Sequence, residues 1–364
     1  MIDFTFLEDT QGYRTKSDRP HPNFSTENKL EEVESVIQAF VNRLRGEEGV
    51  LGVTYGGGIS RGFGDDHSDI DLHIYLTKEA YQQWLQGKGP IPHKDFTFAG
   101  RHFDSLFICY PQENLNHLPL VAKWDRSYQK ILIDPYGKVT ERLVEGDKFS
   151  KNEKIDSFLD DTIHAFWLGD MFVSQCLKRQ DYLTAHFSIN MAVEHLCRLL
   201  FLINDEIPAF KKHLVHYSLT LPWKPADWAQ KIEELLLVKE FSSDEVVRRH
   251  NLFKALYSTI WGKVVGEEWL TLTMRELQRF EELMFIINNE PTMKEFGTLF
   301  PLADLSLEPL FSLLNRETIG GEEKLRFNWA KFEEEKGNEF EDHLTWNQEL
   351  LRNLWKASRF THPT

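Results

Sequence analysis

A short stretch of the sequence combines glycines, a hydroxyl group, a cation and a pair of carboxylates. Residues 57–62 read GGISRG, and Asp69-Ile70-Asp71 follows six residues later. Glycines let the backbone approach a ligand closely, and successive backbone N–H groups can hold phosphate oxygens. Ser60 and Arg61 would add a hydroxyl donor and a positive charge beside those oxygens. The pattern predicts a phosphate-binding turn that faces two acids.

Asp69 and Asp71 are expected to act together. Residues two apart on a strand project from the same face, so the two carboxylates could bind one divalent ion or bridge two. Oxygen ligands favour magnesium over zinc, and magnesium commonly joins protein carboxylates to nucleotide phosphates. Asp104 is the expected third carboxylate of a two-metal site, because residues 101–108 form a β-prone run that could lie beside 69–76. The simpler alternative is a tight turn followed by an edge strand with solvated acids.

The flanking sequence predicts the elements that would position these residues. Apolar residues recur with helical spacing after Ser25 and Thr26, either of which could cap a helix that ends near Gly46. A strand is expected at 51–55, and 69–76 alternates with its acids on one face and Ile70, Leu72 and Ile74 on the other. Further expected elements are a helix at 78–86, a hairpin that turns at Ala99-Gly100, and a strand at 130–134.

Helical periodicity dominates after residue 150. Helices are expected at 152–179, 181–204, 225–239, 243–263 and 266–289, with helical patches near 305–315 and 346–358. The expected fold class is therefore α+β, with a mixed β-sheet flanked by helices and then an all-helical, bundle-like domain. The expected limits are an N-terminal arm at 1–24, a catalytic domain at 25–149 and a helical substrate-binding domain at 150–364.

Composition narrows the classes of function. The 364 residues carry 42 Lys and Arg against 57 Asp and Glu, a formal net charge of -15, so binding along a nucleic-acid backbone is disfavoured. Three cysteines form no disulfide framework or zinc pattern. The N-terminus lacks the features of a signal peptide, and no apolar run reaches the ~18 residues that would span a membrane. We therefore expect a cytoplasmic protein.

The string GGGISRGFGDDHSDIDL (56–72) resembles the signature of the polymerase-β-type nucleotidyltransferase superfamily. Within it, the sequence is most similar to small bacterial enzymes that nucleotidylate kanamycin, streptomycin or lincosamides, and to their uncharacterised relatives. The likeness is sharp over 51–110, continues through KILIDPYGKV (130–139) and is weaker in the helical half, at 189–214. One departure is Gly58, where many antibiotic-modifying members have Ser. A hydroxyl contact to phosphate would then be absent or supplied by Ser60.

The resemblance implies a role for each candidate residue. Asp69 and Asp71 would hold magnesium on the triphosphate of ATP or another NTP, and Asp104 would hold a second ion near the attacking hydroxyl. The residues that would position the β- and γ-phosphates are Gly57, Gly58, Ser60 and Arg61, with Lys211 as a further cation. The proton acceptor would be Asp104 or Glu194, although Glu194 could instead pair with Arg198, and Lys211 could simply be solvated like Lys212.

The implied reaction transfers a nucleoside monophosphate, AMP by expectation, to a hydroxyl of a small molecule and releases pyrophosphate. The acidic composition could attract a cationic acceptor such as an aminoglycoside antibiotic. One alternative is nucleotidylation of a protein partner, as in antitoxins that modify a toxin. Another is a nucleotide-sensing protein without turnover. Neither a membrane nor a nucleic acid is an expected partner, and a homo-oligomer is left open.

Overall fold

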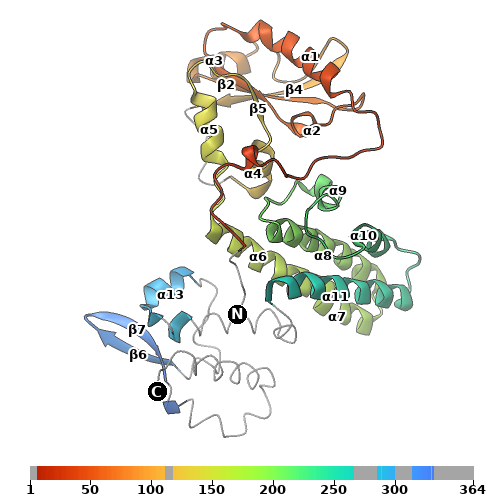
Figure 1. Cartoon of the computed structure of the whole chain (residues 1–364), viewed down its shortest axis with the longest axis vertical. Coiled ribbons are helices and arrows are strands. Elements are labelled where there is room, and N and C mark those ends of the chain that lie inside the picture. The colour runs from red at the N-terminus through yellow and green to blue at the C-terminus, as the bar shows by residue number, and fades with distance from the viewer. Residues whose placement is uncertain are drawn as a thin grey trace. The chain divides into compact units, whose positions relative to one another are not determined.

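The computed structural model describes residues 6–110, 118–265, 285–287, 289–299, 314–328 and 330–331. The chain forms two compact units, Phe4–Ile260 and Met1–Asp3 with Trp261–Thr364. The first unit holds the sheet and the helices that follow it (Figure 1). The expected α+β class is confirmed. The domain limits expected from the sequence stay a prediction, since compactness divides the chain between Ile260 and Trp261.

Five strands form one mixed sheet in the order β3-β4-β2-β1-β5. Their bounds are Val50–Tyr55 (β1), Ile70–Leu76 (β2), Lys94–Phe98 (β3), Arg101–Cys109 (β4) and Lys130–Ile133 (β5). β2 pairs parallel with β4 and antiparallel with β1, which also pairs antiparallel with β5. The predicted hairpin is confirmed, because β3 and β4 are antiparallel and join at Ala99 and Gly100, both with positive φ.

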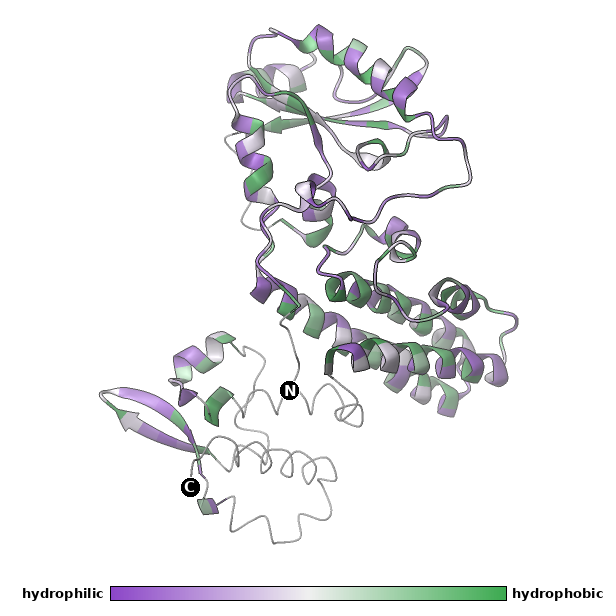
Figure 2. Cartoon of the chain, viewed as in Figure 1, coloured by the Kyte–Doolittle hydropathy of each residue, from purple (hydrophilic) through white to green (hydrophobic). Residues whose placement is uncertain are grey.

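The two faces of the sheet are covered differently. The surrounding helices are α1 (Leu30–Val41), α2 (Gly57–Ser60), α3 (Lys78–Leu85), α4 (Leu120–Arg126) and α5 (Lys138–Gly146), with 3-10 turns η1 (Tyr13–Thr15) and η2 (Asn42–Leu44). Apolar residues of β2 share a core with α1 and α3, and Figure 2 shows hydrophilic and hydrophobic residues alternating along α1. On the other face, Tyr75 packs with Val139 and Leu143 of α5. The predicted alternation of β2 is confirmed.

The start of α1 differs from expectation. The helix begins at Leu30, and neither Ser25 nor Thr26 caps it. The Thr26 hydroxyl donates instead to Asp65 Oδ2 at 2.8 Å, while Asn28 Oδ1 accepts from the N–H groups of Leu30 and Gly64. Contacts to the loop after α2 therefore replace the expected cap and hold residues 24–28 beside that loop.

The helices after residue 150 belong to the first unit up to Ile260, which lies within the last of them. They are α6 (Lys151–Phe166), the π-helix η4 (Trp167–Met171), α7 (Phe172–Arg179), α8 (Tyr182–Ile203), the 3-10 turn η5 (Lys211–His213), α9 (Leu214–Ser218), α10 (Trp228–Leu236) and α11 (Ser243–Val265). A capping box formed by Ser150 and Glu153 starts α6. The helices expected at 152–179, 181–204, 225–239 and 243–263 are confirmed, with a π-turn inside the first.

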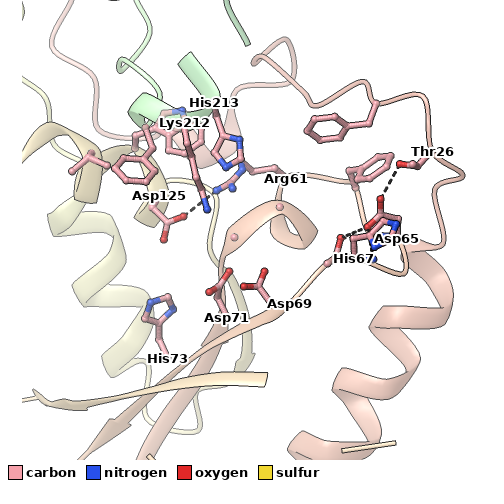
Figure 3. Close-up of a pocket in the computed structure, with 18 of the residues that line it drawn as sticks. Thr26, Arg61, Asp65, His67, Asp69, Asp71, His73, Asp125, Lys212 and His213 are labelled. Carbon is pink, nitrogen blue, oxygen red and sulfur yellow. Dashed lines mark hydrogen bonds and ion pairs between the residues drawn. The ribbon is translucent and has the colours of Figure 1, made fainter. Parts of the chain in front are cut away.

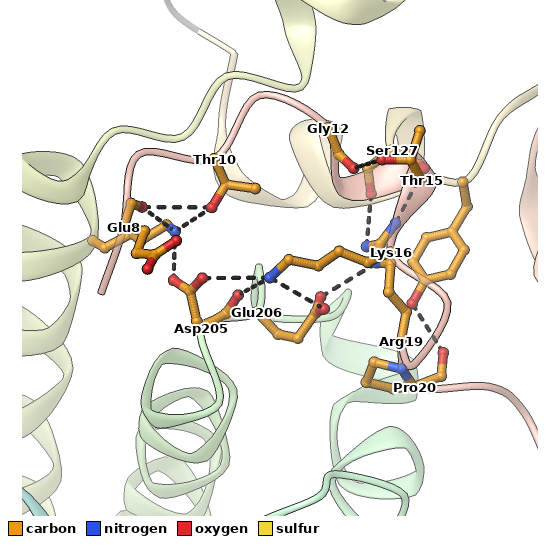
Figure 4. A network of polar contacts seen from close by, with 12 residues as sticks. Glu8, Thr10, Gly12, Thr15, Lys16, Arg19, Pro20, Ser127, Asp205 and Glu206 are labelled. Atoms are coloured by element: carbon orange, nitrogen blue, oxygen red, sulfur yellow. Dashed lines mark hydrogen bonds and ion pairs between the residues drawn. The ribbon is translucent and has the colours of Figure 1, made fainter. Parts of the chain in front are cut away.

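The N-terminal arm is bonded to the helical half and to the segment that follows α4 (Figure 4). The fully buried Lys154 ammonium donates to the Glu8 carbonyl at 2.6 Å, to Thr10 Oγ1 at 2.8 Å and to Asp205 Oδ1 at 2.5 Å. Arg19 contacts Glu206 and, through two nitrogens, Ser127 after α4. Because these partners lie far apart in the sequence, the arm joins the two halves of the unit.

The second unit contains α13 (Met293–Leu299) and a hairpin of β6 (Leu314–Ile319) and β7 (Glu322–Phe327). A core of Ile286, Phe296 and Leu325 connects them. Most of the helix expected at 266–289 and of the patch at 305–315, and all of that at 346–358, lie outside the described residues; Leu314 and Asn315 belong to β6. Within the described ranges, every helix is too short or too polar to cross a membrane.

Candidate functional site

A pocket of about 610 Å³ opens where the start of β2, α2, α4, η5 and residues 24–26 meet (Figure 3). Its polar lining includes four aspartates, Asp65, Asp69, Asp71 and Asp125. Aromatic residues complete the wall, namely Phe24, Phe63, Trp124 and Phe210. The pocket lies on the face of β2 that α5 leaves open, since the packing of α5 involves Tyr75 further along that strand.

Gly57 brings the backbone against the carboxylate of Asp71. Its φ is +64°, and a Cβ built there would lie 1.9 Å from Asp71 Oδ2. The neighbouring Gly56 N–H donates to the Asp71 carbonyl at 2.9 Å, which joins the turn to the start of β2. Gly57 and Gly58 both line the pocket and form the first turn of α2, where backbone N–H groups have no partner within the helix. The glycine turn and Asp71 are therefore held against each other by direct contacts.

Negative charges outnumber positive charges around Asp71. Burial, followed by the charges of Asp69, Asp125 and Asp104, raises its pKa from the ordinary 3.8 to about 6, and Arg61 opposes this rise. Asp69 is exposed and lies one residue before β2. Both aspartates point into the pocket (Figure 3).

Asp104 lies beside Asp71 on the neighbouring parallel strand and pairs with it in register. The expected strand neighbourhood is therefore present, and directly paired residues project from the same face of a sheet. Asp104 is exposed, and it is absent from the pocket lining, which holds Asp125 instead. The structure thus supplies two candidates for a third carboxylate, Asp104 on β4 beside Asp71 and Asp125 on the helix α4.

The donor set fits a hard divalent cation. Carboxylate oxygens from Asp69 and Asp71 face a common space. Burial and then repulsion from Asp69 raise the pKa of Asp71, and a bound cation would oppose both effects. In the described part of the chain, no three His, Cys, Asp or Glu side chains are grouped closely enough to hold an ion by themselves. Phosphate oxygens of a bound nucleotide and water would have to complete the coordination, as magnesium sites commonly require.

Arg61 is held rigidly at the opposite side of the pocket from Asp69 and Asp71 (Figure 3). Its Nη1 donates to Asp125 Oδ1 at 3.0 Å and its Nε donates to the Tyr217 hydroxyl at 3.1 Å. The guanidinium lies 4.5 Å from the ring centre of Trp124, within cation–π range. These contacts come from α4 and from Tyr217 on α9, so the sheet part and the helical part together fix a residue of the glycine turn.

Besides Asp104, three of the sequence-derived candidates lie elsewhere than the pocket lining. The Ser60 hydroxyl donates to the Gly57 carbonyl at 2.9 Å, and the side chain is buried. Glu194 and Lys211 form an ion pair with each other, and Arg198 donates to Asp161. The Ser60 hydroxyl is therefore bonded to the backbone of its own turn. The charges of Glu194 and Lys211 neutralise each other.

The sequence did not single out several polar residues that line the pocket, among them Asp65, Asp125, Lys212 and His213. Burial, together with the charges of Arg61 and Lys212, lowers the pKa of His213 to about 4, so its ring is neutral at pH 7. Lys212 is adjacent in sequence to the expected Lys211, and the sequence offers no signal that separates the two. Asp125 follows Trp124 in an amphipathic helix, where nothing local distinguishes it from a solvated acid.

No protein-family model matches the chain, and no curated protein matches it. Among solved structures, the chain is similar to a nucleotidyltransferase-like protein from Exiguobacterium sibiricum 255-15. The sequence identity is 14%, the TM-score is 0.39, and the match covers 81% of this chain and 99% of that chain.

Proposed function

We propose that the protein is a magnesium-dependent nucleotidyltransferase that transfers a nucleoside monophosphate, AMP from ATP by preference, to a hydroxyl of a small molecule. The observation that carries the proposal is the close approach of the glycine turn to Asp71. An acid pressed against a helix N-terminus would normally be paired or solvated, whereas Asp71 is partly buried among other acids. A cation-bound polyphosphate would balance both the acids and the backbone N–H groups.

Each pocket residue has a task in this reaction. Asp69 and Asp71 would hold magnesium, which when bound neutralises phosphate charge and stabilises the entering and leaving oxygens. Arg61 and Lys212 would contact the β- and γ-phosphates from the other side of the pocket. The acceptor oxygen would form a bond to the α-phosphorus while the bond to pyrophosphate breaks. Its proton would pass to a carboxylate, for which Asp104 and Asp125 are the candidates.

The size and charge of the pocket support a small acceptor. Its volume of about 610 Å³ lies in the usual range for sites that bind small molecules. Four aspartates against Arg61 and Lys212 leave negative charge after a metal-bound triphosphate is accommodated, which favours a cationic acceptor. Aromatic side chains on several walls would suit a base or a ring.

The test is to incubate the protein with ATP, Mg²⁺ and a panel of hydroxyl compounds, and to follow pyrophosphate release and acceptor mass. Asp71→Asn should lower turnover by about 100-fold or more. Calorimetry should show that this variant loses the Mg²⁺-dependent part of ATP binding. Asp66→Asn is the matched control, because Asp66 contacts Lys29 and Arg101 and does not line the pocket. If wild type and Asp71→Asn are equally inert and neither binds Mg-ATP, the proposal is wrong.

A further inference from the structure

Two neighbouring helical segments each expose a row of large apolar side chains. On α8, Leu183, Phe187 and Met191 follow at intervals of four, and the first two are 68% and 65% exposed. On η4, Trp167 and Met171 are likewise four apart and exposed. Residues four apart lie on one helix face, so each row is a continuous strip. Exposed apolar patches of this kind mark interaction surfaces in soluble proteins.

The two strips lie on the same side of the helical part. α6, η4 and α7 follow one another beside α8 (Figure 1), and the Ser188 hydroxyl donates to the Leu168 carbonyl at 2.6 Å. The rings of His164 and His195 stack at 5.0 Å, which shows that the outer sides of α6 and α8 adjoin. We call the combined surface of Trp167, Met171, Leu183, Phe187 and Met191 the apolar face.

The π-helix η4 exposes Trp167 and Met171 on its outer side, while its inner side packs against another helix. Leu168 and Gly169 are buried, and a Cβ at Gly169 would lie 2.1 Å from the ring of Phe253 on α11. Helix α11 therefore packs against the inner side of η4. π-turns interrupt regular helix geometry and occur frequently at functional positions. Here the interruption leaves Trp167 and Met171 exposed.

We propose that the apolar face binds the same face of a second copy of this chain, in a two-fold dimer with α8 antiparallel to its counterpart. In such a pairing the two-fold axis passes at Phe187, so Phe187 contacts Phe187 of the second copy. Residues at equal distances before and after it face each other. Leu183 then faces Met191 of the second copy. The bond from Ser188 to Leu168 puts the centre of η4 level with Phe187, so Trp167 faces Met171 of the second copy. Large apolar and aromatic residues suit the centre of an interface of about 800 Å² per partner.

Charges that flank the strip of Trp167 and Met171 favour self-pairing in this orientation. Asp160 lies seven residues before Trp167 and Lys178 lies seven residues after Met171, so both share the face of the strip, and both are exposed. The Asp160 carboxylate contacts His164 of its own helix, at 3.3 Å. The mirror relation that joins Trp167 to Met171 also brings Asp160 opposite Lys178 of the second copy. A parallel arrangement would instead place Asp160 against Asp160. Because the chain carries a net charge of -15, copies repel at long range, and association needs such a local match.

The first test measures the mass of the full chain by sedimentation from ~1 to ~100 μM. We expect a concentration-dependent dimer, and Phe187→Glu should weaken it at least tenfold. Tyr136→Glu is the matched control, since Tyr136 is an aromatic residue with 70% exposure in the sheet part of the chain. A wild-type monomer throughout this range would overturn the proposal, as would a dimer that Phe187→Glu leaves intact.

The second test checks the two-fold geometry. Phe187→Cys should form a disulfide-linked dimer under mild oxidation, because a residue on the two-fold axis meets itself, whereas Tyr136→Cys should not. The native Cys109, Cys176 and Cys197 are buried and would not compete. Asp160→Lys and Lys178→Asp should each weaken the dimer, and the double variant should recover association. A double variant weaker than both single variants would rule out the antiparallel arrangement.

Discussion

The carboxylate of Asp71 lies so close to Gly57 that even a methyl group at Gly57 would overlap Asp71 Oδ2. The contact joins the first residue of α2 to the second residue of β2, across thirteen intervening positions. It explains why a glycine is required at this point and why the acid is held in one place. The site therefore depends on the absence of a side chain as much as on the charged groups.

Replacing Gly57 by Ala should damage both folding and the site. The substitution forces a Cβ to within 1.9 Å of Asp71 Oδ2 and imposes a positive φ on a non-glycine residue. We expect a loss of roughly 1–3 kcal/mol in the free energy of unfolding and loss of Mg-ATP binding. Gly58→Ala is the control for stability, because the atom nearest to its Cβ would be the Phe63 carbonyl oxygen at 3.7 Å. Equal unfolding free energies of the two variants would refute this account of Gly57.

The raised pKa of Asp71 predicts opposite pH effects on stability and on metal binding. Its folded-state pKa of about 6 exceeds the ordinary 3.8, so between these values the folded protein binds more protons than the unfolded chain. Lowering the pH from 7 to 4 without metal should therefore raise the contribution of Asp71 to the free energy of unfolding by up to roughly 2–3 kcal/mol. Mg²⁺ affinity should fall over the same range, because protons and metal compete for the carboxylate.

Asp71→Asn provides the comparison for this pH effect. Asparagine at this position has no charge to desolvate, so the variant should be more stable than wild type at pH 7 without metal. Denaturant titrations at several pH values measure the difference. A wild-type pH profile identical to that of Asp71→Asn would show that Asp71 titrates normally.

The adjacent lysines Lys211 and Lys212 should behave differently. Lys211 pairs with Glu194, whereas Lys212 lines the pocket with Arg61. Lys212→Ala should weaken ATP binding by about tenfold and AMP binding less, because the lost charge faces the terminal phosphates. Lys211→Ala and Glu194→Gln should leave both affinities within about twofold, and the reverse ranking of the lysines would contradict the assignment. Isothermal calorimetry with the two nucleotides provides the measurement.

The buried ammonium of Lys154 should be important for the stability of the N-terminal arm. Lys154→Met removes the donor shared by the Glu8 carbonyl, Thr10 and Asp205 and leaves these acceptors partly unsatisfied. We expect a loss of about 2–4 kcal/mol in unfolding free energy, smaller than for an isolated pair because Lys16 still contacts Asp205. Lys16→Met, a more exposed partner of the same acid, should cost about 1 kcal/mol. Chemical denaturation tests both, and a loss for Lys154→Met no larger than for Lys16→Met would contradict it.

Local patterns in the sequence were sufficient for the strands and helices that frame the site. The alternation of β2, the turn at Ala99-Gly100 and the helical periodicity between 151 and 265 each depend on residues close in sequence, so they predict the elements directly. The prediction that Ser25 or Thr26 caps α1 was wrong. Thr26 bonds to Asp65 instead, and nothing in the local sequence around Thr26 indicates that partner.

The sequence by itself determined that a glycine turn precedes two aspartates on one strand face, because backbone geometry and the two-residue period leave little choice. Only the tertiary structure decided which cations and acids join them. Lys212 rather than Lys211 lines the pocket, Asp125 from α4 reaches Arg61, and Ser60 bonds to its own turn. Those outcomes depend on how α4, η5 and the arm pack against the sheet, and side chains that meet through packing carry no signal in the local order of residues.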